Sequence, residues 1–362
     1  MIAKVVFWAS AGALVWTHAG YPLAARALAR VRPRPVRTDE EALPTVAVIV
    51  AAHDEEPVIE RRVANLRELD YPSDRLEVVV TSDASTDRTE ELAEAAGARV
   101  IRNPRGGKVA AQDSAVRQTR SDVVAFSDAN CTWAPDALRK LVRSFADPDV
   151  AYVCGRLNLE PGDGGNKEGL YWRFELALRA DESRIDSVTG GNGSIYAVRR
   201  EDYLEVDPRF GHDLSFPYRM VQRGRRAVYD AEANAFEKAT PTNEDEYRRK
   251  VRMFEHCWAI VVEGKMLRHL RPVYFVEVVS HRHLRYASGL LHVVLLGSTI
   301  ALLGQPLYQV ALGLQLGLLA AAAVGVGVAR YYVLVTWATL EALVKYLRRG
   351  VPTTWEPAEG TR

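Results

Sequence analysis

The residues best suited to chemistry follow an apolar segment in the middle of the chain. Residues 123–127 read Val-Val-Ala-Phe-Ser, which predicts a buried strand, and Asp128, Ala129 and Asn130 come directly after it. A buried parallel strand that ends in an acid and an amide presents oxygen ligands to a divalent metal ion that carries a diphosphate. The alternative is that Asp128 and Asn130 cap a helix beginning near Pro135. These residues alone leave both interpretations open.

Residues 46–127 alternate between two kinds of pattern. Short apolar runs rich in β-branched residues predict strands, and the segments between them have the periodicity of amphipathic helices. The predicted strands are 46–51, 76–81, 98–101 and 123–127, and the predicted helices are 58–69, 87–96 and 109–119. This alternation predicts a doubly wound α/β domain, in which helices cover both faces of a parallel sheet.

Polar residues gather where each predicted strand ends. In a doubly wound sheet, ligands bind beyond the carboxyl ends of the strands. One polar turn is common, but four at the same edge predict a binding site. The four clusters are residues 53–56, 82–87, 103–108 and 127–130.

The second half of the soluble part is less regular. Its sequence predicts a helix over 170–184, a glycine-rich turn at 190–193, a short strand over 194–198, a helix from about 210 to 223 and a long helix over 243–265. The long helix begins at a sequence that resembles a capping box.

Apolar and charged residues are segregated along the chain. It has 362 residues, of which 47 are basic, 46 are acidic and 48% are hydrophobic. Residues 5–29 are almost free of charge until Arg26, and residues 286–328 contain no Asp, Glu, Lys or Arg. Both segments exceed the roughly 20 apolar residues that cross a bilayer. We therefore predict a membrane protein with a soluble middle.

The first apolar segment has two interpretations. Small residues near its end would suit a cleaved signal peptide. However, the apolar run is longer than that of a typical signal peptide, and five arginines crowd its C-terminal side, at positions 26, 30, 32, 34 and 37. The positive-inside rule then favours a retained anchor and a cytoplasmic soluble part. The spacing of the three cysteines indicates neither a disulfide framework nor a zinc site, which fits a reducing compartment.

Read in order, the motifs of the soluble part resemble those of family 2 glycosyltransferases, which have the GT-A fold. The resemblance runs from Val46 to Trp258, and the order of the short strings makes it specific. The strings are Ala52-His-Asp-Glu-Glu56, Ser82-Asp-Ala-Ser-Thr-Asp87, Gly107-Lys108, Ser127-Asp-Ala-Asn130, Gly190-Gly-Asn-Gly-Ser194, Asp213-Leu-Ser215 and Arg249-Lys-Val-Arg252. Gly20-Tyr21-Pro22 and residues 280–286 are similar to the flanks of membrane-bound members.

The resemblance implies a site for a nucleotide-diphosphate sugar. Asp54 or Glu55, together with Asp83, would contact the nucleoside, although acids at these positions could also cap the helices that follow. Lys108 would neutralise the diphosphate from a glycine turn. The other implied donor contacts are Asn192, through sugar hydroxyls, and the helical pair Arg249 and Arg252, through phosphate.

The resemblance also implies a divalent metal ion. Asp128 and Asn130 would bind Mg2+ or Mn2+, which bridges the diphosphate oxygens. Asn130 stands where the family usually has a second aspartate. This departure lowers the expected metal affinity or calls for another acid such as Glu237, unless Glu237 lies on the surface.

Asp213 would be the catalytic base of an inverting displacement, because it would take the proton of the acceptor hydroxyl. An N-cap role for Asp213 is the alternative. His212 replaces the usual acidic neighbour of the base, and Met253 replaces a tryptophan that stacks on the acceptor in polymer-forming members. Trp133 or Trp258 could replace that tryptophan, unless both belong to the core.

The leading hypothesis is an inverting, metal-dependent transferase that moves a sugar, with a uridine nucleotide favoured as donor, to a lipid or glycan acceptor of the cell envelope. The alternatives are a processive polysaccharide synthase and a catalytically inactive scaffold that binds the donor, the latter motivated by Asn130, His212 and Met253. We expect a multi-pass cell-membrane location, a cytoplasmic catalytic domain and no nucleic-acid partner. The sequence leaves oligomerisation open.

The predicted domain organisation follows from these patterns. It comprises an anchor at 1–30, a basic linker at 31–44, a GT-A domain at 45–265, an interfacial segment at 266–286, a membrane region of two or three segments at 287–348 and a tail at 349–362. Within the interfacial segment, His281 and His283 are expected to face lipid headgroups. Residues 331–346 suit either an interfacial helix or a third C-terminal span, and the resemblance favours the span.

Overall fold

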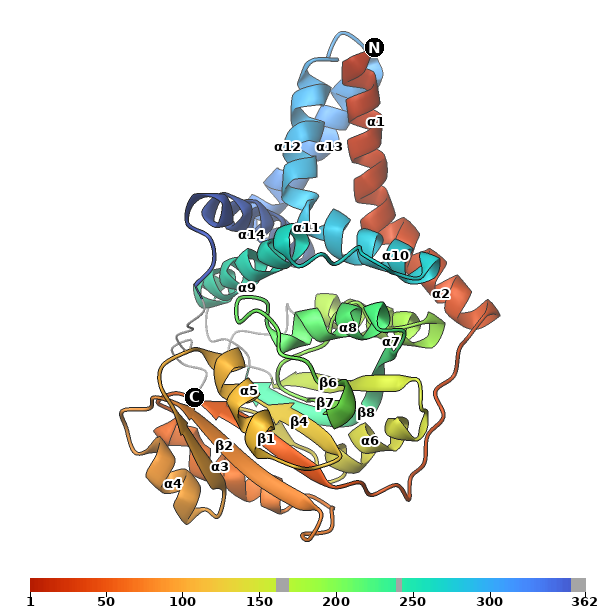
Figure 1. The fold of residues 1–362 in the computed structure, drawn as a ribbon. Helices are drawn as coiled ribbons and strands as arrows, with labels where there is room; N and C mark the ends of the chain where they lie inside the picture. The colour runs from red at the N-terminus through yellow and green to blue at the C-terminus, as the bar shows by residue number, and fades with distance from the viewer. Residues whose placement is uncertain (161–168, 239–242, 353–362) are drawn as a thin grey trace.

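The structure is a computed structural model that describes residues 1–160, 169–238 and 243–352. Within those residues, one sheet of eight strands forms the centre of an α/β domain, in the order β3-β2-β1-β4-β7-β6-β8-β5. A bundle of helices projects from one side of this domain, with the N-terminus at its far tip (Figure 1).

The first four strands form the predicted parallel sheet. β1, β2, β3 and β4 run parallel, β7 lies antiparallel between β4 and β6, and β8 runs parallel to β6. The sheet is therefore mixed. Its strands are β1 (Val46–Ala52), β2 (Leu76–Asp83), β3 (Arg99–Asn103), β4 (Val123–Ser127), β5 (Thr132–Trp133), β6 (Val150–Glu160), β7 (Tyr196–Arg199) and β8 (Arg226–Lys238).

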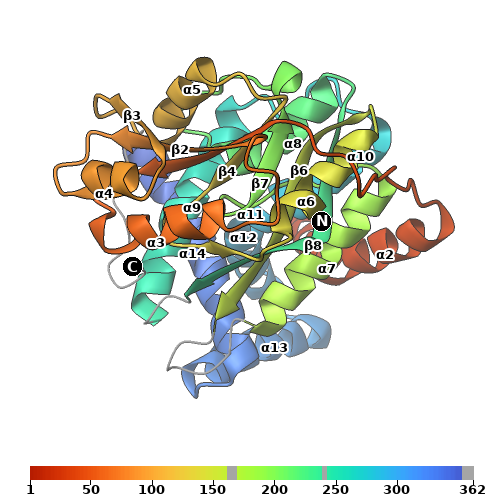
Figure 2. The ribbon, with the colours of Figure 1, turned by 90° about the horizontal axis from the view of Figure 1, so that it is seen from below.

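Helices cover both faces of the sheet, as the alternating pattern predicts. On one face, α3 (Glu56–Arg67), α4 (Thr89–Ala95) and α6 (Ala137–Arg143) bury residues such as Val63 and Leu138. On the other face, α5 (Lys108–Gln118) and α8 (His212–Gln222) bury residues such as Ala115 and Phe216. Figure 2 shows α3 and α5 on opposite sides of the sheet. The remaining elements of this domain are α7 (Gly169–Ile185), α9 (Asn243–Glu263) and the short 3-10 turns Ser144–Ala146 and Arg200–Asp202.

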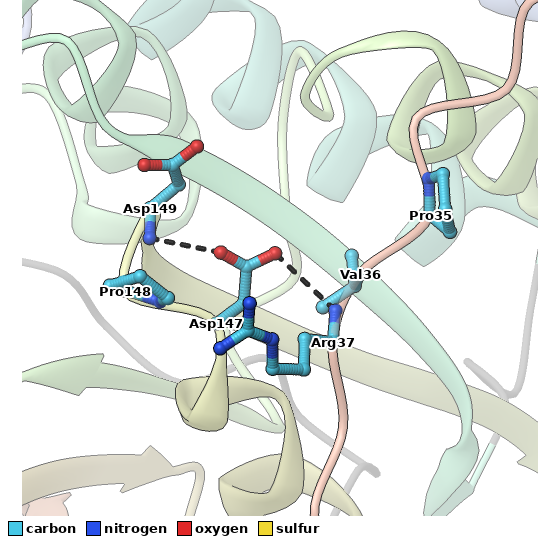
Figure 3. Close-up of a pocket in the computed structure, with 6 residues that line it drawn as sticks. All are labelled: Pro35, Val36, Arg37, Asp147, Pro148 and Asp149. Atoms are coloured by element: carbon cyan, nitrogen blue, oxygen red, sulfur yellow. Dashed lines mark hydrogen bonds between the residues drawn. The ribbon is translucent and has the colours of Figure 1, made fainter.

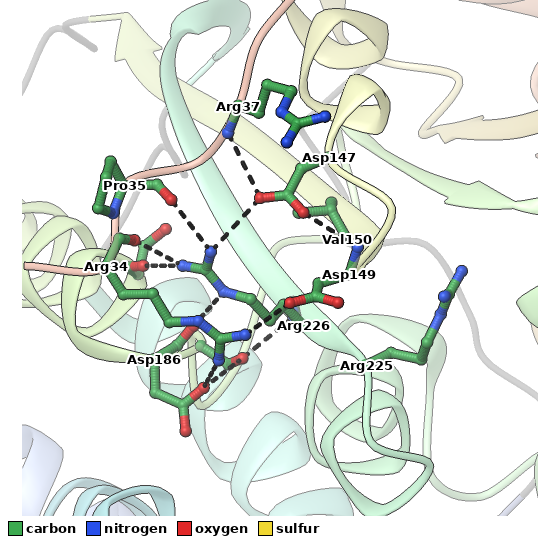
Figure 4. Close-up of polar contacts among 12 residues, drawn as sticks. Arg34, Pro35, Arg37, Asp147, Asp149, Val150, Asp186, Arg225 and Arg226 are labelled. Carbon is green, nitrogen blue, oxygen red and sulfur yellow. Dashed lines mark hydrogen bonds and ion pairs between the residues drawn. The ribbon is translucent and has the colours of Figure 1, made fainter.

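The basic linker is held against the domain by a buried arginine. Arg226, at the start of β8, is 1% exposed and donates hydrogen bonds to the backbone carbonyls of Arg34 (2.9 Å) and Pro35 (3.4 Å). It also donates to the carbonyls of Ser183 (3.2 Å) and Asp186 (3.0 Å) at the end of α7. Figure 4 shows these contacts together with the neighbouring ion pairs of Arg34. One side chain thus joins the linker, α7 and the sheet.

The projecting bundle contains the apolar segments. Residues 2–31 form a continuous helical segment, made of α1 (Ile2–Val15), a π-helical turn (Trp16–Gly20) and α2 (Tyr21–Val31). α1 packs against α12 (Ser288–Ile300) and α13 (Pro306–Ala323) through Phe7, Leu14, Leu295 and Tyr308. Two helices in the described residues, at Ile2–Val31 and Pro306–Ala323, are long and apolar enough to cross a membrane, whereas α12 is shorter.

The last helix is not one of the helices that are long and apolar enough to cross a membrane. α14 (Gly327–Arg349) packs along α9 of the α/β domain, where Ala338 and Ala342 meet Val251 and Trp258. Polar contacts of Glu341 with Tyr247 and of Arg349 with Glu255 extend the same interface. Of the two interpretations of residues 331–346, this packing agrees with the interfacial helix and not with the span that the resemblance favours. The preceding connection consists of α10 (Pro272–Val278), a π-helical turn (Val279–His283) and α11 (Leu284–Tyr286).

Candidate active site

Asp128 lies just beyond β4, at the edge where the parallel strands end. Its carboxylate contacts the ammonium group of Lys108, the first residue of α5, and accepts a 3.1 Å hydrogen bond from the hydroxyl of Ser194. Gly193 leaves room for this pair, because a Cβ there would lie 3.3 Å from Nζ of Lys108. The fold therefore brings together the ends of β3 and β4 and the glycine-rich turn.

Glu237 joins the same group of side chains from β8. The hydroxyl of Ser194 lies 3.2 Å from one oxygen of Glu237, and the amide of Asn130 donates a 3.2 Å hydrogen bond to the other. Burial, followed by the charge of Asp128, raises the pKa of Glu237. Glu237 thus lies beside Asp128 and Asn130, as one alternative of the sequence analysis anticipated, and not on the outer surface.

Lys108 lies among three carboxylates. Burial disfavours its charged form, but the charges of Asp128, Asp213 and Glu237 hold the pKa of Lys108 above its ordinary value. Burial would likewise raise the pKa of Asp128, but the contacts with Lys108 and Ser194 hold it below its ordinary value. Both partners are therefore charged at neutral pH, and this cluster can hold cations as well as a diphosphate.

Arg62 contacts the end of β4 next to Asp128, and the sequence analysis did not include it among the site residues. It is 2% exposed, donates a 2.6 Å hydrogen bond to the hydroxyl of Ser127 and lies over the ring of Trp133. The available signal was its position in the helical pattern, since Arg62 shares the apolar face of α3 with Ile59 and Leu66. An arginine on a core face needs a polar partner inside the protein.

Asp83 holds the glycine turn that leads to Lys108. Its carboxylate accepts hydrogen bonds from the backbone N–H groups of Gly106 (2.7 Å) and Gly107 (3.0 Å) and from the guanidinium of Arg105 (2.7 Å). Gly107 has φ of 90°, a conformation that favours glycine. Both oxygens of Asp83 thus accept hydrogen bonds from the turn that positions Lys108, and its contact with the nucleoside stays a prediction.

The loops after β1 and β2 are tied to each other. Asp54 has φ of 53° and accepts a 2.7 Å hydrogen bond from the backbone N–H of Thr86. Burial opposes its ionisation, but the hydrogen bonds from Thr86 hold the pKa of Asp54 below its ordinary value. Glu55 immediately precedes α3, and its backbone N–H donates a 2.7 Å hydrogen bond to the hydroxyl of Thr89. Asp54 and Glu55 therefore lie at the predicted edge.

Asn192 shapes the glycine-rich turn from inside. Its amide group donates a 2.7 Å hydrogen bond to the carbonyl of Gly155, and its oxygen accepts from the N–H groups of Ser194 (3.2 Å) and Ile195 (2.9 Å). The residue is buried. These backbone contacts place Ser194 beside Asp128, and the contact of Asn192 with sugar hydroxyls stays a prediction.

Asp213 lies in the first turn of α8, beside the glycine-rich turn. The backbone N–H of Gly191 donates a 2.7 Å hydrogen bond to the carbonyl of Asp213, and the half-buried carboxylate of Asp213 acts electrostatically on Lys108. His212 points elsewhere, because its buried ring stacks on Phe216 with centroids 4.3 Å apart and bonds Tyr196. His212 belongs to the core and does not replace the usual acidic neighbour within the site.

The two arginines of α9 differ in position. Arg249 lies close enough to Glu237 for its charge to favour the ionised form, and it donates a 2.9 Å hydrogen bond to Glu246. Arg252 lies on the exposed side of the helix. Trp133 and Trp258 are both buried, and their indole N–H groups bond backbone carbonyls. Neither tryptophan is available to stack on an acceptor.

The position of His281 differs from the one that the sequence analysis predicts. It does not face lipid headgroups, because it is 1% exposed and its two ring nitrogens lie 2.7 Å from Glu182 and 3.1 Å from Glu175. Glu182 also accepts hydrogen bonds from the hydroxyls of Tyr21 (2.7 Å) and Thr189 (3.0 Å). This buried carboxylate thus joins the N-terminal helix, the segment before α12 and the start of the glycine-rich turn.

The structure also has a surface pocket that is separate from this site. Its volume is about 410 Å³, and its lining residues, Pro35, Val36, Arg37, Asp147, Pro148 and Asp149, come from the linker and from the segment before β6 (Figure 3). Arg199, which pairs with the first residue of β4, bonds the carbonyl of Asp147. The pocket therefore lies at the opposite end of β4 from Asp128.

Comparison with known proteins identifies the family. Residues 47–206 match the model of Glycosyl transferase family 2. An N-acetylglucosaminyltransferase of Rhizobium leguminosarum bv. trifolii is 34% identical over 128 residues, which are 33% of this chain and 70% of that protein. The chain belongs to glycosyl transferase family 2. The beta-monoglucosyldiacylglycerol synthase of Synechocystis sp. is 32% identical over 213 residues, which are 54% of this chain and 44% of that protein. The chain thus spans less than half of the length of this family 2 relative.

A solved structure confirms the fold of this family 2 chain. The mannosyltransferase PcManGT from Pyrobaculum calidifontis, in complex with GDP-Man and Mn2+, matches with a TM-score of 0.76. The match covers 96% of this chain and 98% of that chain at 23% identity. It supports the predicted GT-A fold of the mixed sheet.

Proposed function

We propose that this protein transfers a sugar from a nucleoside diphosphate to an acceptor hydroxyl, with inversion at the anomeric carbon. One observation carries the proposal: Lys108 contacts Asp128 and lies within the electrostatic influence of Glu237 and Asp213. A site for a diphosphate and a candidate base therefore lie around one ammonium group. The structurally similar mannosyltransferase was solved in complex with GDP-Man and Mn2+, which agrees with this assignment.

Asp213 would act as the general base. Its carboxylate takes the proton of the acceptor hydroxyl while that oxygen forms a bond to the anomeric carbon. The bond from the anomeric carbon to the diphosphate oxygen breaks, and the nucleoside diphosphate leaves. Gly191 holds the backbone of Asp213 through its 2.7 Å hydrogen bond, which keeps the base beside the glycine-rich turn.

Lys108 would stabilise the leaving group. Its ammonium stands at the start of α5, where backbone N–H groups also point toward an anion, so the two can share the charge of a diphosphate. We assign Arg249 a supporting role, since it reaches the same region from α9. Asp54 and Glu55, which lie between the end of β1 and the start of α3, remain candidates for contact with the nucleoside.

The donor set around Ser194 fits a divalent metal ion. Asp128 and Glu237 offer hard carboxylate oxygens, both lie within 3.2 Å of the same hydroxyl, and Asn130 lies beside them. Two acids held this close are stabilised by a cation between them. Mg2+ or Mn2+ bound there would neutralise the charge that develops on the departing diphosphate. No group of three or more His, Cys, Asp or Glu suited to a metal occurs in the described residues, so the set depends on Asn130 or substrate oxygens.

We further propose that the projecting bundle lies in the cytoplasmic membrane. Large apolar side chains on α1, α12 and α13 are exposed in this structure, among them Trp8, Val293, Val310, Leu314 and Leu316. Such a surface is stable in lipid and unfavourable in water. The arginines after α1 favour a cytoplasmic catalytic domain. The acceptor would then be a lipid or glycan at that membrane face.

The structure supports a non-processive enzyme more than a processive synthase. Met253 occupies the place of the family tryptophan, and the two candidate substitutes, Trp133 and Trp258, are buried. Neither of these two tryptophans can therefore stack on a growing chain in the way that the family tryptophan does. Product length measured with the purified protein tests this preference, and products of many sugar units would contradict it.

The experiment that tests the proposal is a donor screen with a variant of the base. Uridine, guanosine and thymidine diphosphate sugars are incubated with the purified protein and Mn2+, and release of nucleoside diphosphate is measured. We expect Asp213→Asn to lose at least about a hundredfold in kcat, as for a general base. Asp207→Asn, outside the cluster and paired with Arg209, is the matched control. Equal rates in wild type and Asp213→Asn would refute the assignment, and no release from any donor would favour the inactive scaffold.

A further inference from the structure

Two arginines lie against the glycine-rich turn from the side of the membrane bundle. Arg179, in α7, donates a 3.1 Å hydrogen bond to the carbonyl of Gly191. Arg282, in the π-helical turn before α11, donates a 3.0 Å hydrogen bond to the hydroxyl of Thr189 and approaches Gly190, where a Cβ would lie 2.5 Å from its Nη2 atom. The two guanidinium groups thus contact consecutive residues of one loop.

Neither arginine has an acidic partner. Among the described residues, no carboxylate lies within ion-pair distance of Arg179 or Arg282, although arginines elsewhere in the domain have such pairs. Arg179 is 7% exposed, and its buried Nη1 atom has no hydrogen-bond partner. The rings of Trp172 and Tyr229 lie beneath its guanidinium, at 5.9 Å and 5.8 Å.

This arrangement is costly without a ligand. Burying a charged group without an opposite charge is unfavourable, and the aromatic faces next to Arg179 offset only part of this cost. Burial opposes the charged form of Arg282, but Tyr286 and the charge of Glu182 hold the pKa of Arg282 above its ordinary value. Arg179 has no such acid within ion-pair distance in the described part of the chain, where Glu182 and Glu175 pair with His281 and Glu175 also pairs with Arg285. Two guanidinium groups that contact one loop and form no ion pair among the described residues are suited to bind a phosphate oxyanion, which accepts several hydrogen bonds at once.

The location of the pair indicates which substrate carries the anion. Lys108 and Asp128, where the donor diphosphate would bind, lie beside Gly193, whereas the two arginines contact residues 189–191. Gly191 contacts Arg179 through its carbonyl and Asp213 through its N–H. Gly191 therefore connects Arg179 to the backbone of Asp213, the candidate base. Arg282 precedes α12, which places this part of the turn next to the membrane bundle.

We infer that Arg179 and Arg282 bind a phosphate group of the acceptor, so that a hydroxyl of the same molecule reaches Asp213. This inference rests on the proposed function and narrows its acceptor to a phosphate-bearing alcohol. The phosphate belongs either to a membrane lipid headgroup or to a soluble phosphate ester, and the chemistry of recognition is the same for both.

The test is a direct binding measurement with the full chain in detergent. Isothermal titration compares mixed micelles that contain phosphatidylglycerol, micelles that contain diacylglycerol, and soluble sn-glycerol 3-phosphate. We expect binding of one or both phosphate-bearing probes and at least tenfold weaker binding of diacylglycerol. Arg179→Gln and Arg282→Gln are each expected to weaken the phosphate-bearing probe at least tenfold, with partial recovery in Arg282→Lys. Arg184→Gln, an exposed arginine of the same helix, is the matched control.

Each result of the binding measurement either identifies the source of the phosphate or contradicts the inference. Binding of phosphatidylglycerol alone identifies a lipid source, and binding of glycerol 3-phosphate alone identifies a soluble one. Equal binding of diacylglycerol, no binding of either phosphate-bearing probe, or equal affinity in the two glutamine variants would overturn the inference. Nucleoside diphosphate binding in the presence of Mn2+, measured on every variant, reports folding of the donor side. Its absence in wild type would contradict the proposed function and leave the phosphate result to stand by itself.

Discussion

The backbone N–H of Gly191 donates a hydrogen bond of 2.7 Å to the backbone carbonyl of Asp213. This bond fixes the candidate base relative to the glycine-rich turn. The turn has little freedom to move, because a Cβ on Gly191 would lie 1.9 Å from the hydroxyl of Tyr152. Position 191 therefore requires glycine for lack of space, and the geometry of Asp213 depends on it.

Gly191→Ala is expected to displace the turn and to lower kcat at least about tenfold, because small misplacements of reacting groups are costly. Tyr152→Phe removes the clashing hydroxyl, which has no hydrogen-bond partner in the described part of the chain. The double variant Gly191→Ala, Tyr152→Phe should therefore recover part of the activity. Donor turnover of the three variants checks this. A double variant no better than Gly191→Ala would show that the hydroxyl does not set the position of the turn.

Asn130→Asp would place a third carboxylate beside Asp128 and Glu237. Asn130 now donates a hydrogen bond to Glu237, and an aspartate would replace this bond by repulsion. We expect a lower melting temperature without metal and a larger increase on addition of Mn2+ than in wild type. Thermal unfolding with and without Mn2+ measures both quantities. An unchanged Mn2+ effect would count against a place for residue 130 among the metal ligands.

Arg226→Met would detach the linker from the domain. Four backbone carbonyls would lose their donor, and the expected loss of stability is about 3 kcal/mol. Arg225→Met is the matched control, since this neighbour forms a half-exposed ion pair with Asp202 and should change stability by less than about 1 kcal/mol. Denaturant unfolding and limited proteolysis of residues 32–44 provide the readouts. Similar losses for the two variants would contradict the special role of Arg226.

Glu277→Gln tests a buried acid in α10. Neither carboxyl oxygen of Glu277 has a hydrogen-bond partner among the described residues, and burial, followed by the charges of Glu182 and Asp186, raises its pKa. The folded state therefore holds this proton more tightly than the unfolded chain does. The resulting stability is fully present below the unfolded pKa, about 4.3, and is lost as the pH rises through the folded value.

Glutamine at position 277 has no carboxyl group to ionise, so the variant avoids the loss of stability that wild type shows as the pH rises. We expect Glu277→Gln to be more stable than wild type at pH 8, because burial and the charges of Glu182 and Asp186 raise the pKa of Glu277. At pH 5 the two proteins should differ less. Thermal unfolding at both pH values measures the difference in stability between the variant and wild type. An equal gain in stability at pH 5 and pH 8 would exclude titration of Glu277 as its cause.

The strands could be predicted where their sequence is apolar throughout. β1 and β4 are buried on both faces, so their residues form continuous apolar runs. β6 and β8 were not predicted. In β8, alanines alternate with charged and polar residues, and alanine has a low preference for strands. Its place in the sheet depends on pairing with β6, which lies far away in the sequence.

The site was predictable at the level of loops but not of individual contacts. The strand ends gave Lys108 and Asp128, because topology alone brings them to one edge. The sequence could not show that Asp83 is occupied by the N–H groups of Gly106 and Gly107, or that Asn192 is occupied by its own loop. Glu237 was only one of many acids until β8 placed it beside Asn130, which is 107 residues away.

The hydrogen bond from Tyr21 to Glu182 ties the N-terminal helix to the residues next to the candidate site. Glu182 also bonds Thr189, which begins the turn that positions Asp213. A copy of the protein that has lost its first helix would keep a buried acid without one of its donors, next to the acceptor side of the site. Loss of the first helix should therefore disturb the turn that positions Asp213 and lower the rate of sugar transfer, so that the apolar N-terminal segment is coupled directly to the candidate site.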